Sequence, residues 1–304
     1  MKHFCFLLII LLTSLVMNTA CSADKPAVEM PTVNNHRPLN IAHRGARSLA
    51  PENTLAAARL GLEIGADMWE LDVAMTADGE LVVLHDDTLE RTSNARQVFP
   101  DRSPWLVHTF TLDELRQLDF GSWFNETDPF KQIASGAVTE EMQQRYVGEP
   151  IPTLREALTF TKENNWRVNV EIKDATGFPP DKDLPEKVVA LIKALQMTDR
   201  VLISSFNHNY LTRVKAANPN LPLAALVESP PDDPIALVQG LGALGYNPGI
   251  KRLNPNDIPA IRQAGVEVYV WTVNDEATMR RLIDNNVSGI FTDFPQLLKT
   301  LLNE

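Results

Sequence analysis

Three carboxylates have the spacing to bind a divalent cation. Glu70 and Asp72 stand two residues apart, and Glu171 lies in a separate apolar run. Side chains at positions i and i+2 of a strand leave the same face, so Glu70 and Asp72 are expected to point together. Clustered carboxylates repel one another unless a cation neutralises them, and such oxygen ligands suit Ca²⁺ or Mg²⁺ better than Zn²⁺. The competing interpretation is that Glu70 pairs with a Lys or Arg while Asp72 is solvated.

Two histidines, His43 and His85, could carry protons, because imidazole titrates near neutral pH. Such a pair can flank a phosphorus atom, one histidine taking a proton and the other giving one. Arg44 directly follows His43, and Lys173 stands two residues after Glu171. Both cations could bind phosphate oxygens. These residue types together indicate metal-dependent hydrolysis of a phosphodiester.

Strands must position these residues, and the apolar runs from residue 39 onward predict them. The expected strands are residues 39–43, 68–75, 81–85, 167–173, 201–206, 223–227, 246–253, 266–272 and 289–292. Helical patterns separate most of them, at residues 55–66, 154–162, 184–195, 210–217, 235–241, 258–264, 276–285 and 295–302. Asp78-Gly79 predicts a tight turn between the second and third runs.

Repeated strand–helix units predict a parallel sheet covered by helices. Residues 68–85 count as one barrel strand, which makes eight units and predicts an α/β fold of the (β/α)₈ TIM-barrel type. Active sites of such barrels lie at the carboxyl ends of the strands, where the polar residues above are found. An open doubly wound sheet is the alternative, but no glycine-rich phosphate loop follows the first strand.

Residues 87 to about 150 interrupt the alternation. They are rich in polar and turn residues, and their apolar residues look scattered along the sequence. The segment is therefore predicted to be an insertion after the second strand region rather than a separate core. The catalytic barrel is expected to span residues 39–304.

The N-terminus has the character of an export signal. A basic start precedes an apolar run from Phe4 to Met17, which is too short to span a membrane comfortably. Thr19-Ala20 before Cys21 resembles a bacterial lipoprotein cleavage box, although Asn18 stands where an aliphatic residue is usual. We predict a lipoprotein-type signal peptide at 1–21, a flexible tether at 22–38, and a periplasmic or membrane-anchored protein. Ordinary cleavage after Ala20 or Ala23 is the alternative.

Charge and cysteine content limit the possible binding partners and the possible site of membrane attachment. The net charge of −11 disfavours nucleic acid as a partner, because that binding depends on Lys and Arg. The two cysteines are Cys5, inside the signal, and Cys21. The mature chain therefore can hold no internal disulfide, and attachment to a membrane would pass through Cys21.

Several separated motifs resemble those of the glycerophosphodiester phosphodiesterase family. They follow the family order across nearly all of residues 39–300, and they are His43-Arg44-Gly45-Ala46, Pro51-Glu52-Asn53-Thr54, Glu70-Leu71-Asp72-Val73, Thr76-Ala77-Asp78-Gly79, His85-Asp86, Arg91-Thr92, Ile151-Pro152-Thr153-Leu154, Glu171-Ile172-Lys173, Ser205-Phe206, Trp271-Thr272-Val273-Asn274 and Thr292-Asp293.

The resemblance implies a TIM barrel with a family insertion. It also implies hydrolysis of deacylated phospholipids, such as glycerophosphocholine or glycerophosphoethanolamine, to sn-glycerol 3-phosphate and an alcohol. Carried over by position, it implies metal ligands at Glu70, Asp72 and Glu171, acid–base catalysis by His43 and His85, phosphate contacts from Arg44 and Lys173, support of the metal site or of Arg44 by Glu52, and a glycerol pocket lined by Phe206 and Trp271.

Other functions fit the same residues less well. A phospholipase C or D on a related barrel could share this chemistry, but it would need apolar loops to meet intact lipid. A binding protein that captures the substrate without cleaving it would usually lack a histidine or a metal carboxylate. Water and the substrate's own 2-hydroxyl group both fit as nucleophile, and either histidine could act first as the base. Nothing in the sequence predicts an oligomeric state or a head-group preference.

Overall fold

The computed structural model describes residues 37–304 together with Met1. The signal peptide and the tether expected from the sequence therefore lie outside the described residues, apart from Met1, Arg37 and Pro38. Within residues 37–304, no helix has both the length and the apolar character needed to cross a membrane.

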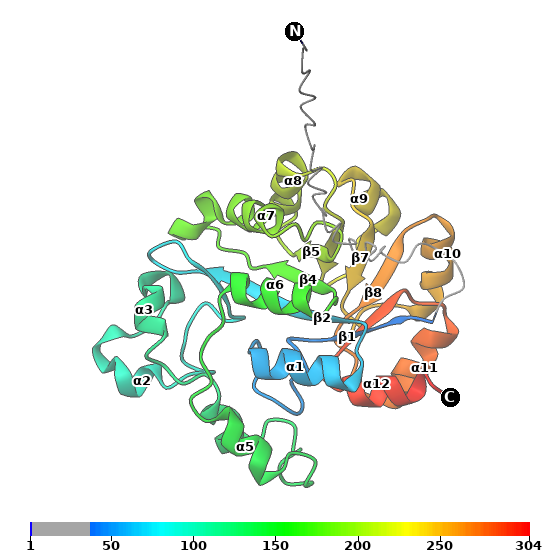
Figure 1. The fold of residues 1–304 in the computed structure, drawn as a ribbon. Helices are drawn as coiled ribbons and strands as arrows, with labels where there is room; N and C mark the ends of the chain where they lie inside the picture. The colour runs from blue at the N-terminus through cyan, green and yellow to red at the C-terminus, as the bar shows by residue number, and fades with distance from the viewer. Residues whose placement is uncertain (2–36) are drawn as a thin grey trace.

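Eight parallel strands form a closed barrel (Figure 1). Around the ring they follow chain order, and the last strand pairs with the first. Closure confirms the expected (β/α)₈ fold and excludes the open sheet. The barrel strands are β1 (Leu39–Ala42), β2 (Met68–Met75), β4 (Val168–Ile172), β5 (Val201–Ser205), β6 (Leu223–Val227), β7 (Gly245–Pro248), β8 (Glu267–Val270) and β9 (Gly289–Thr292).

Helices cover the outside of the barrel, as alternating strand and helix patterns require (Figure 1). They are α1 (Leu55–Ile64), α6 (Leu154–Glu163), α7 (Leu184–Ala194), α8 (His208–Ala217), α9 (Pro234–Gly240), α10 (Ile258–Gln263), α11 (Glu276–Asp284) and α12 (Pro295–Leu301). Most boundaries fall within one or two residues of those expected. The largest difference is at β7, which ends at Pro248 rather than at residue 253.

The strand β2 runs past the rim of the barrel and carries a hairpin. One edge pairs with β4, while the other pairs first with β1 and then, at residues 73–75, with β3 (Leu81–Val83). The strand β3 is antiparallel to β2 and lies outside the ring. The hairpin continues as Leu84 donates its backbone N–H to the carbonyl of Asp72 at 3.0 Å. The hairpin thereby brings His85, the next residue along the chain, beside Asp72.

The lower interior of the barrel is apolar and closes it below the site. Its buried side chains are Leu39, Ile41, Met68, Leu202, Ala224, Tyr269 and Phe291. Side chains alternate along a strand, so the next inward positions of β2, β4 and β5 are polar. The close packing of the apolar side chains below keeps the strands, and with them the charged residues near the rim, in fixed positions.

The segment between β3 and α6 contains the short helices α2 (Ala95–Val98), α3 (Leu112–Leu115), α4 (Ser122–Thr127) and α5 (Glu140–Tyr146). It lies to one side of the barrel (Figure 1). Its apolar residues are not scattered in space, contrary to their look in the sequence. They form two buried clusters. One packs on Ala74 and Val82 of the hairpin and includes Leu89, Val107, Phe110, Leu115, Phe120 and Ile151. The other packs on Ala50 and Ala57 and includes Phe124, Val138 and Tyr146. Elements this short show no periodicity, so the clusters could not be recognised beforehand.

The loop after β1 packs against α1 at a glycine. Gly45 has a φ of +82°, and a Cβ atom there would lie 2.6 Å from the carbonyl carbon of Ala57. No other residue type fits so close an approach at positive φ. The contact fixes the path of His43 and Arg44, which directly precede this glycine.

Candidate active site

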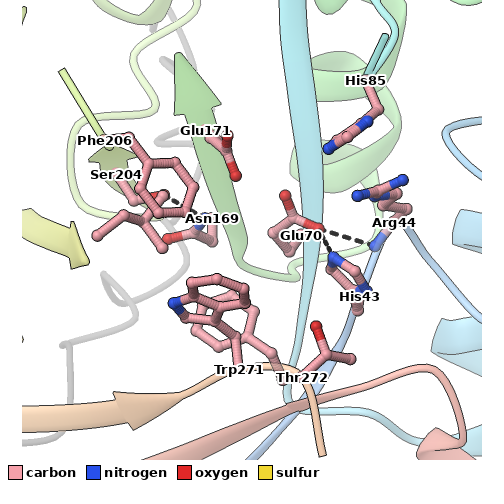
Figure 2. A pocket seen from close by; sticks show the side chains of 12 residues that line it. His43, Arg44, Glu70, His85, Asn169, Glu171, Ser204, Phe206, Trp271 and Thr272 are labelled. Atoms are coloured by element: carbon pink, nitrogen blue, oxygen red, sulfur yellow. Dashed lines mark hydrogen bonds and ion pairs between the residues drawn. The ribbon is translucent and has the colours of Figure 1, made fainter. Parts of the chain in front are cut away.

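A pocket of about 450 Å³ opens at the carboxyl ends of the strands, where the barrel fold places active sites (Figure 2). Most residues predicted from the sequence line it, namely His43, Arg44, Glu70, His85, Glu171, Phe206 and Trp271. The remaining ones, Glu52, Asp72 and Lys173, stand behind these residues and contact them. Asn169 and Ser204 also line the pocket, and the sequence patterns did not single them out.

The three carboxylates converge as their spacing predicted. Oxygen atoms of Glu70, Asp72 and Glu171 all lie within 4.8 Å of one another. Glu70 and Asp72 are 2% and 1% exposed, so Asp72 is not solvated. One oxygen of each, Glu70 Oε1 and Asp72 Oδ1, has no hydrogen-bond partner among the residues that the structure describes. Buried carboxylate oxygen atoms that lack a hydrogen-bond partner are suitable ligands for a hard divalent cation.

Two positively charged side chains balance only part of the negative charge of the three carboxylates. The guanidinium Nε of Arg44 lies 3.3 Å from Asp72, and Nζ of Lys173 lies 2.8 Å from Glu171 and 3.6 Å from Asp72. Burial alone would raise the pKa of Asp72, but Arg44 and Lys173 outweigh it and hold that pKa well below its usual range. Burial and the charge of Asp72 raise the pKa values of Glu70 and Glu171. The cluster therefore favours one more positive charge.

Each histidine is held by an aspartate at Nδ1. His43 Nδ1 lies 2.7 Å from Asp293, and His85 Nδ1 lies 2.6 Å from Asp86. An acidic partner at Nδ1 favours the tautomer with its proton there, which leaves Nε2 free. Nε2 of His43 faces the carboxylates, 3.9 Å from Glu70. Both imidazole rings are thus held in a fixed orientation, and burial together with Arg44 lowers the pKa of His43.

The aspartate partners were missed from the sequence, although signals for both were present. Asp86 directly follows His85, and Asp293 ends the last strand. Asp293 reaches His43 only because β9 pairs with β1 when the barrel closes. Its second oxygen accepts a hydrogen bond from Asn274 Nδ2 at 2.7 Å, which fixes the carboxylate in place.

Glu52 is the centre of an arginine cluster beneath the pocket rim. It is 5% exposed and lies 2.7 Å from Arg44, 2.8 Å from Arg47 and 2.7 Å from Arg91. Arg91 also donates to Asp86, the partner of His85, at 2.7 Å. Burial alone would raise the pKa of Glu52, but Arg44 and the neighbouring arginines hold it well below its usual range. One carboxylate thus connects Arg44 with the residues that hold His85.

Two aromatic rings form the wall opposite His85. Phe206 and Trp271 meet edge to face with their centroids 5.4 Å apart. Trp271 donates its indole N–H to the carbonyl of Asn247 at 2.8 Å, and its ring covers Gly249, where a Cβ would lie 3.2 Å away. The end of β7, to which the sequence patterns assigned no role, therefore supports Trp271.

Replacing Glu52 by glutamine should destabilise the protein. Glu52→Gln keeps the volume but removes the charge that compensates three arginines, and breaking such a buried ion pair costs about 3 kcal/mol. The measurement is the free energy of unfolding in urea at pH 7. Because the folded pKa of Glu52 lies below its ordinary value of 4.5, the unfolded chain takes up the proton more readily. The difference from wild type should therefore be largest above pH 5 and shrink as the pH falls below 4.5.

The matched control is Glu186→Gln. Glu186 lies 2.6 Å from Arg213, but both side chains reach solvent, with 46% and 22% exposed. An exposed pair of this kind contributes less than about 1 kcal/mol. Equal losses in the two variants would show that Glu52 is not the buried centre described above.

Comparisons with known proteins agree with this geometry. The model of the Glycerophosphoryl diester phosphodiesterase family matches residues 43–297. A glycerophosphodiester phosphodiesterase of Caldanaerobacter subterraneus subsp. tengcongensis is 35% identical over 266 residues, which cover 88% of this chain and 98% of that protein. Another, of Bacillus subtilis, is 34% identical over 304 residues, which cover 96% of this chain and 94% of that protein.

A solved structure shares the fold and is related in sequence. A phosphodiesterase of Oleispira antarctica, solved in complex with the product sn-glycerol-3-phosphate, superposes with a TM-score of 0.72 at 29% identity. The match covers 88% of this chain and 98% of that one. The family model spans most of the barrel, and the relatives align along nearly their whole length. The chain therefore belongs to the glycerophosphoryl diester phosphodiesterase family.

Proposed function

We propose that this protein hydrolyses glycerophosphodiesters, such as glycerophosphocholine and glycerophosphoethanolamine, to sn-glycerol 3-phosphate and an alcohol. The observation that carries the proposal is the arrangement of two histidines, each held at Nδ1 by an aspartate, around a cluster of three carboxylates. The relative from Oleispira antarctica binds sn-glycerol-3-phosphate as its product, which supports the same product here.

Glu70, Asp72 and Glu171 would hold one divalent cation, Ca²⁺ or Mg²⁺. The assignment is supported by the convergence of the three carboxylates and by Glu70 Oε1 and Asp72 Oδ1, which have no hydrogen-bond partner within residues 37–304. When bound, the cation would neutralise charge on the phosphoryl oxygens and polarise the phosphorus. Glu52 would hold Arg44 in place at 2.7 Å, and Arg44 and Lys173 would then bind the phosphate oxygens.

His43 and His85 would carry out the proton transfers. One histidine accepts a proton at Nε2 from the nucleophile as a new phosphorus–oxygen bond forms. The other donates a proton to the alcohol oxygen as its bond to phosphorus breaks. Water and the 2-hydroxyl group of the substrate both fit as nucleophile. With the 2-hydroxyl group, a cyclic phosphate forms first and water then opens it. Phe206 and Trp271 would pack against the carbon atoms of glycerol.

The proposal predicts metal-dependent release of sn-glycerol 3-phosphate from glycerophosphocholine. Chelator-treated protein should lose the activity, and Ca²⁺ or Mg²⁺ should restore it. Glu171→Gln should lower turnover about 10²-fold or more, because a cation ligand is lost. The control Glu228→Gln changes an exposed glutamate just beyond β6 and should leave turnover unchanged. Full activity of protein shown to contain no metal would refute the cation site, and no release under any condition would refute the reaction.

The histidine roles predict a second set of variants. His43→Ala and His85→Ala should each lower turnover by about 10²-fold or more while the protein stays folded, since acid–base groups contribute on this scale. The measurement is turnover of glycerophosphocholine, with circular dichroism to check folding. His108→Ala, a histidine that packs on Phe178 and does not line the pocket, is the control. Near-normal turnover of either folded pocket variant would remove that histidine from the mechanism.

Export and lipid attachment at Cys21 are proposed from the sequence alone. The prediction is that wild-type protein made in a bacterial host incorporates radiolabelled palmitate and stays with the membrane fraction, whereas Cys21→Ser does neither. An anchor with a pair of acyl chains would hold the protein at a membrane without making lipid its substrate. Labelling of neither protein, with both found in the periplasm, would indicate ordinary cleavage.

A further inference from the structure

Two polar side chains form part of the pocket floor. Asn169 on β4 and Ser204 on β5 point into the barrel and are each 1% exposed. Asn169 Nδ2 donates a hydrogen bond to Ser204 Oγ at 2.8 Å. Figure 2 shows the pair on the opposite side of Glu70 from Arg44 and His85, beside Phe206 and above Trp271. The pair therefore lies in the part of the pocket remote from the groups assigned to the phosphate.

The pair has hydrogen-bonding capacity that the described part of the chain does not use. Asn169 Oδ1 is buried and has no partner there. Ser204 Oγ accepts from Asn169, and its own proton has no acceptor among residues 37–304. The pocket floor thus offers one acceptor and one donor side by side. A hydroxyl group matches this arrangement, because it donates one hydrogen bond and accepts others.

We infer that Asn169 and Ser204 recognise the free glycerol hydroxyl group that is furthest from the phosphate. This inference rests on the proposed function, since it assumes that glycerol occupies the pocket. With the phosphate held by Arg44 and Lys173, the carbon chain extends along Phe206 and Trp271. The terminal hydroxyl group then reaches the floor, donating to Asn169 Oδ1 and accepting from Ser204.

The inference gives a physical basis for selectivity toward deacylated substrates. An acyl ester at this position has no proton to donate, so Asn169 Oδ1 would stay buried and unpaired, which is costly. The floor is also closed by Leu226 and Phe291, which are 5% and 3% exposed. An acyl chain would find no space beyond them. A lysophospholipid acylated at this oxygen should therefore be a poor substrate.

A purely structural role would explain less. The bond from Asn169 to Ser204 does join β4 to β5, and that role accounts for Nδ2 and Oγ. It does not account for the buried carbonyl oxygen of Asn169. Proteins rarely bury such an oxygen without a hydrogen-bond partner, so a ligand is expected to supply one.

The test compares two substrates that differ in one hydroxyl group. Glycerophosphocholine carries the terminal hydroxyl, whereas the phosphocholine diester of propane-1,2-diol keeps the 2-hydroxyl and lacks the terminal one. Wild-type kcat/KM should be about 10²-fold lower for the propanediol diester, because the site is left with unpaired polar groups. Ser204→Ala and Asn169→Leu should each lower kcat/KM for glycerophosphocholine about tenfold or more. Both should leave the value for the propanediol diester within about twofold, so that the selectivity falls about tenfold or more.

The matched control is Ser205→Ala. Ser205 is equally buried, but its hydroxyl donates to the carbonyl of Ile172 at 2.8 Å and does not line the pocket. Any effect of this variant should be the same on both substrates. Equal kcat/KM values of the wild type for the two diesters would overturn the inference while leaving the proposed function intact. Equal losses on both substrates in the floor variants would also overturn it and assign the pair a structural role. Hydrolysis of neither substrate would remove the proposed function, and the inference with it.

Discussion

The mutual repulsion of Glu70, Asp72 and Glu171 is the constraint on which the site depends. Three carboxylates within 4.8 Å of one another, two of them buried and one partly buried, are tolerable only with positive charge around them. Arg44 and Lys173 supply part of that charge. What remains uncompensated makes the cluster suited to a cation. In the proposed reaction, Arg44 and Lys173 would also bind the phosphate oxygens, so the same two side chains would serve both charge balance and substrate binding.

The two histidines beside this cluster are held by two sets of contacts, which Arg47 links by lying 2.8 Å from Glu52 and 3.6 Å from Asp293. Asp293 and Asn274 hold His43 at the junction where the last strand meets the first. Glu52, Arg91 and Asp86 hold His85 at the end of the β2–β3 hairpin. Each histidine is thus oriented by its own aspartate, and the two line the same pocket from different elements.

The pocket has two chemically different ends. Charged residues crowd one end, around Arg44 and His85, while aromatic rings and a neutral polar pair form the other. A glycerophosphodiester has the same division, with an anionic phosphate at one end of a small polyol. The charged end of the pocket therefore suits the phosphate, and the aromatic and neutral polar end suits the glycerol.

The barrel and the charged site residues were predictable from the sequence, because strand and helix periodicity is local and because parallel strands present their carboxyl ends together. Glu70 with Asp72 and Glu171 with Lys173 follow from side-chain alternation alone. The packing of residues 87–150 did not follow, since its elements are too short to show a period. Nor did the contact between His43 and Asp293, which are 250 residues apart and meet only on closure of the barrel. Asn169 and Ser204 look like ordinary strand residues in the sequence. Only the tertiary structure shows that both line the pocket and that Asn169 Oδ1 is buried with no partner among residues 37–304.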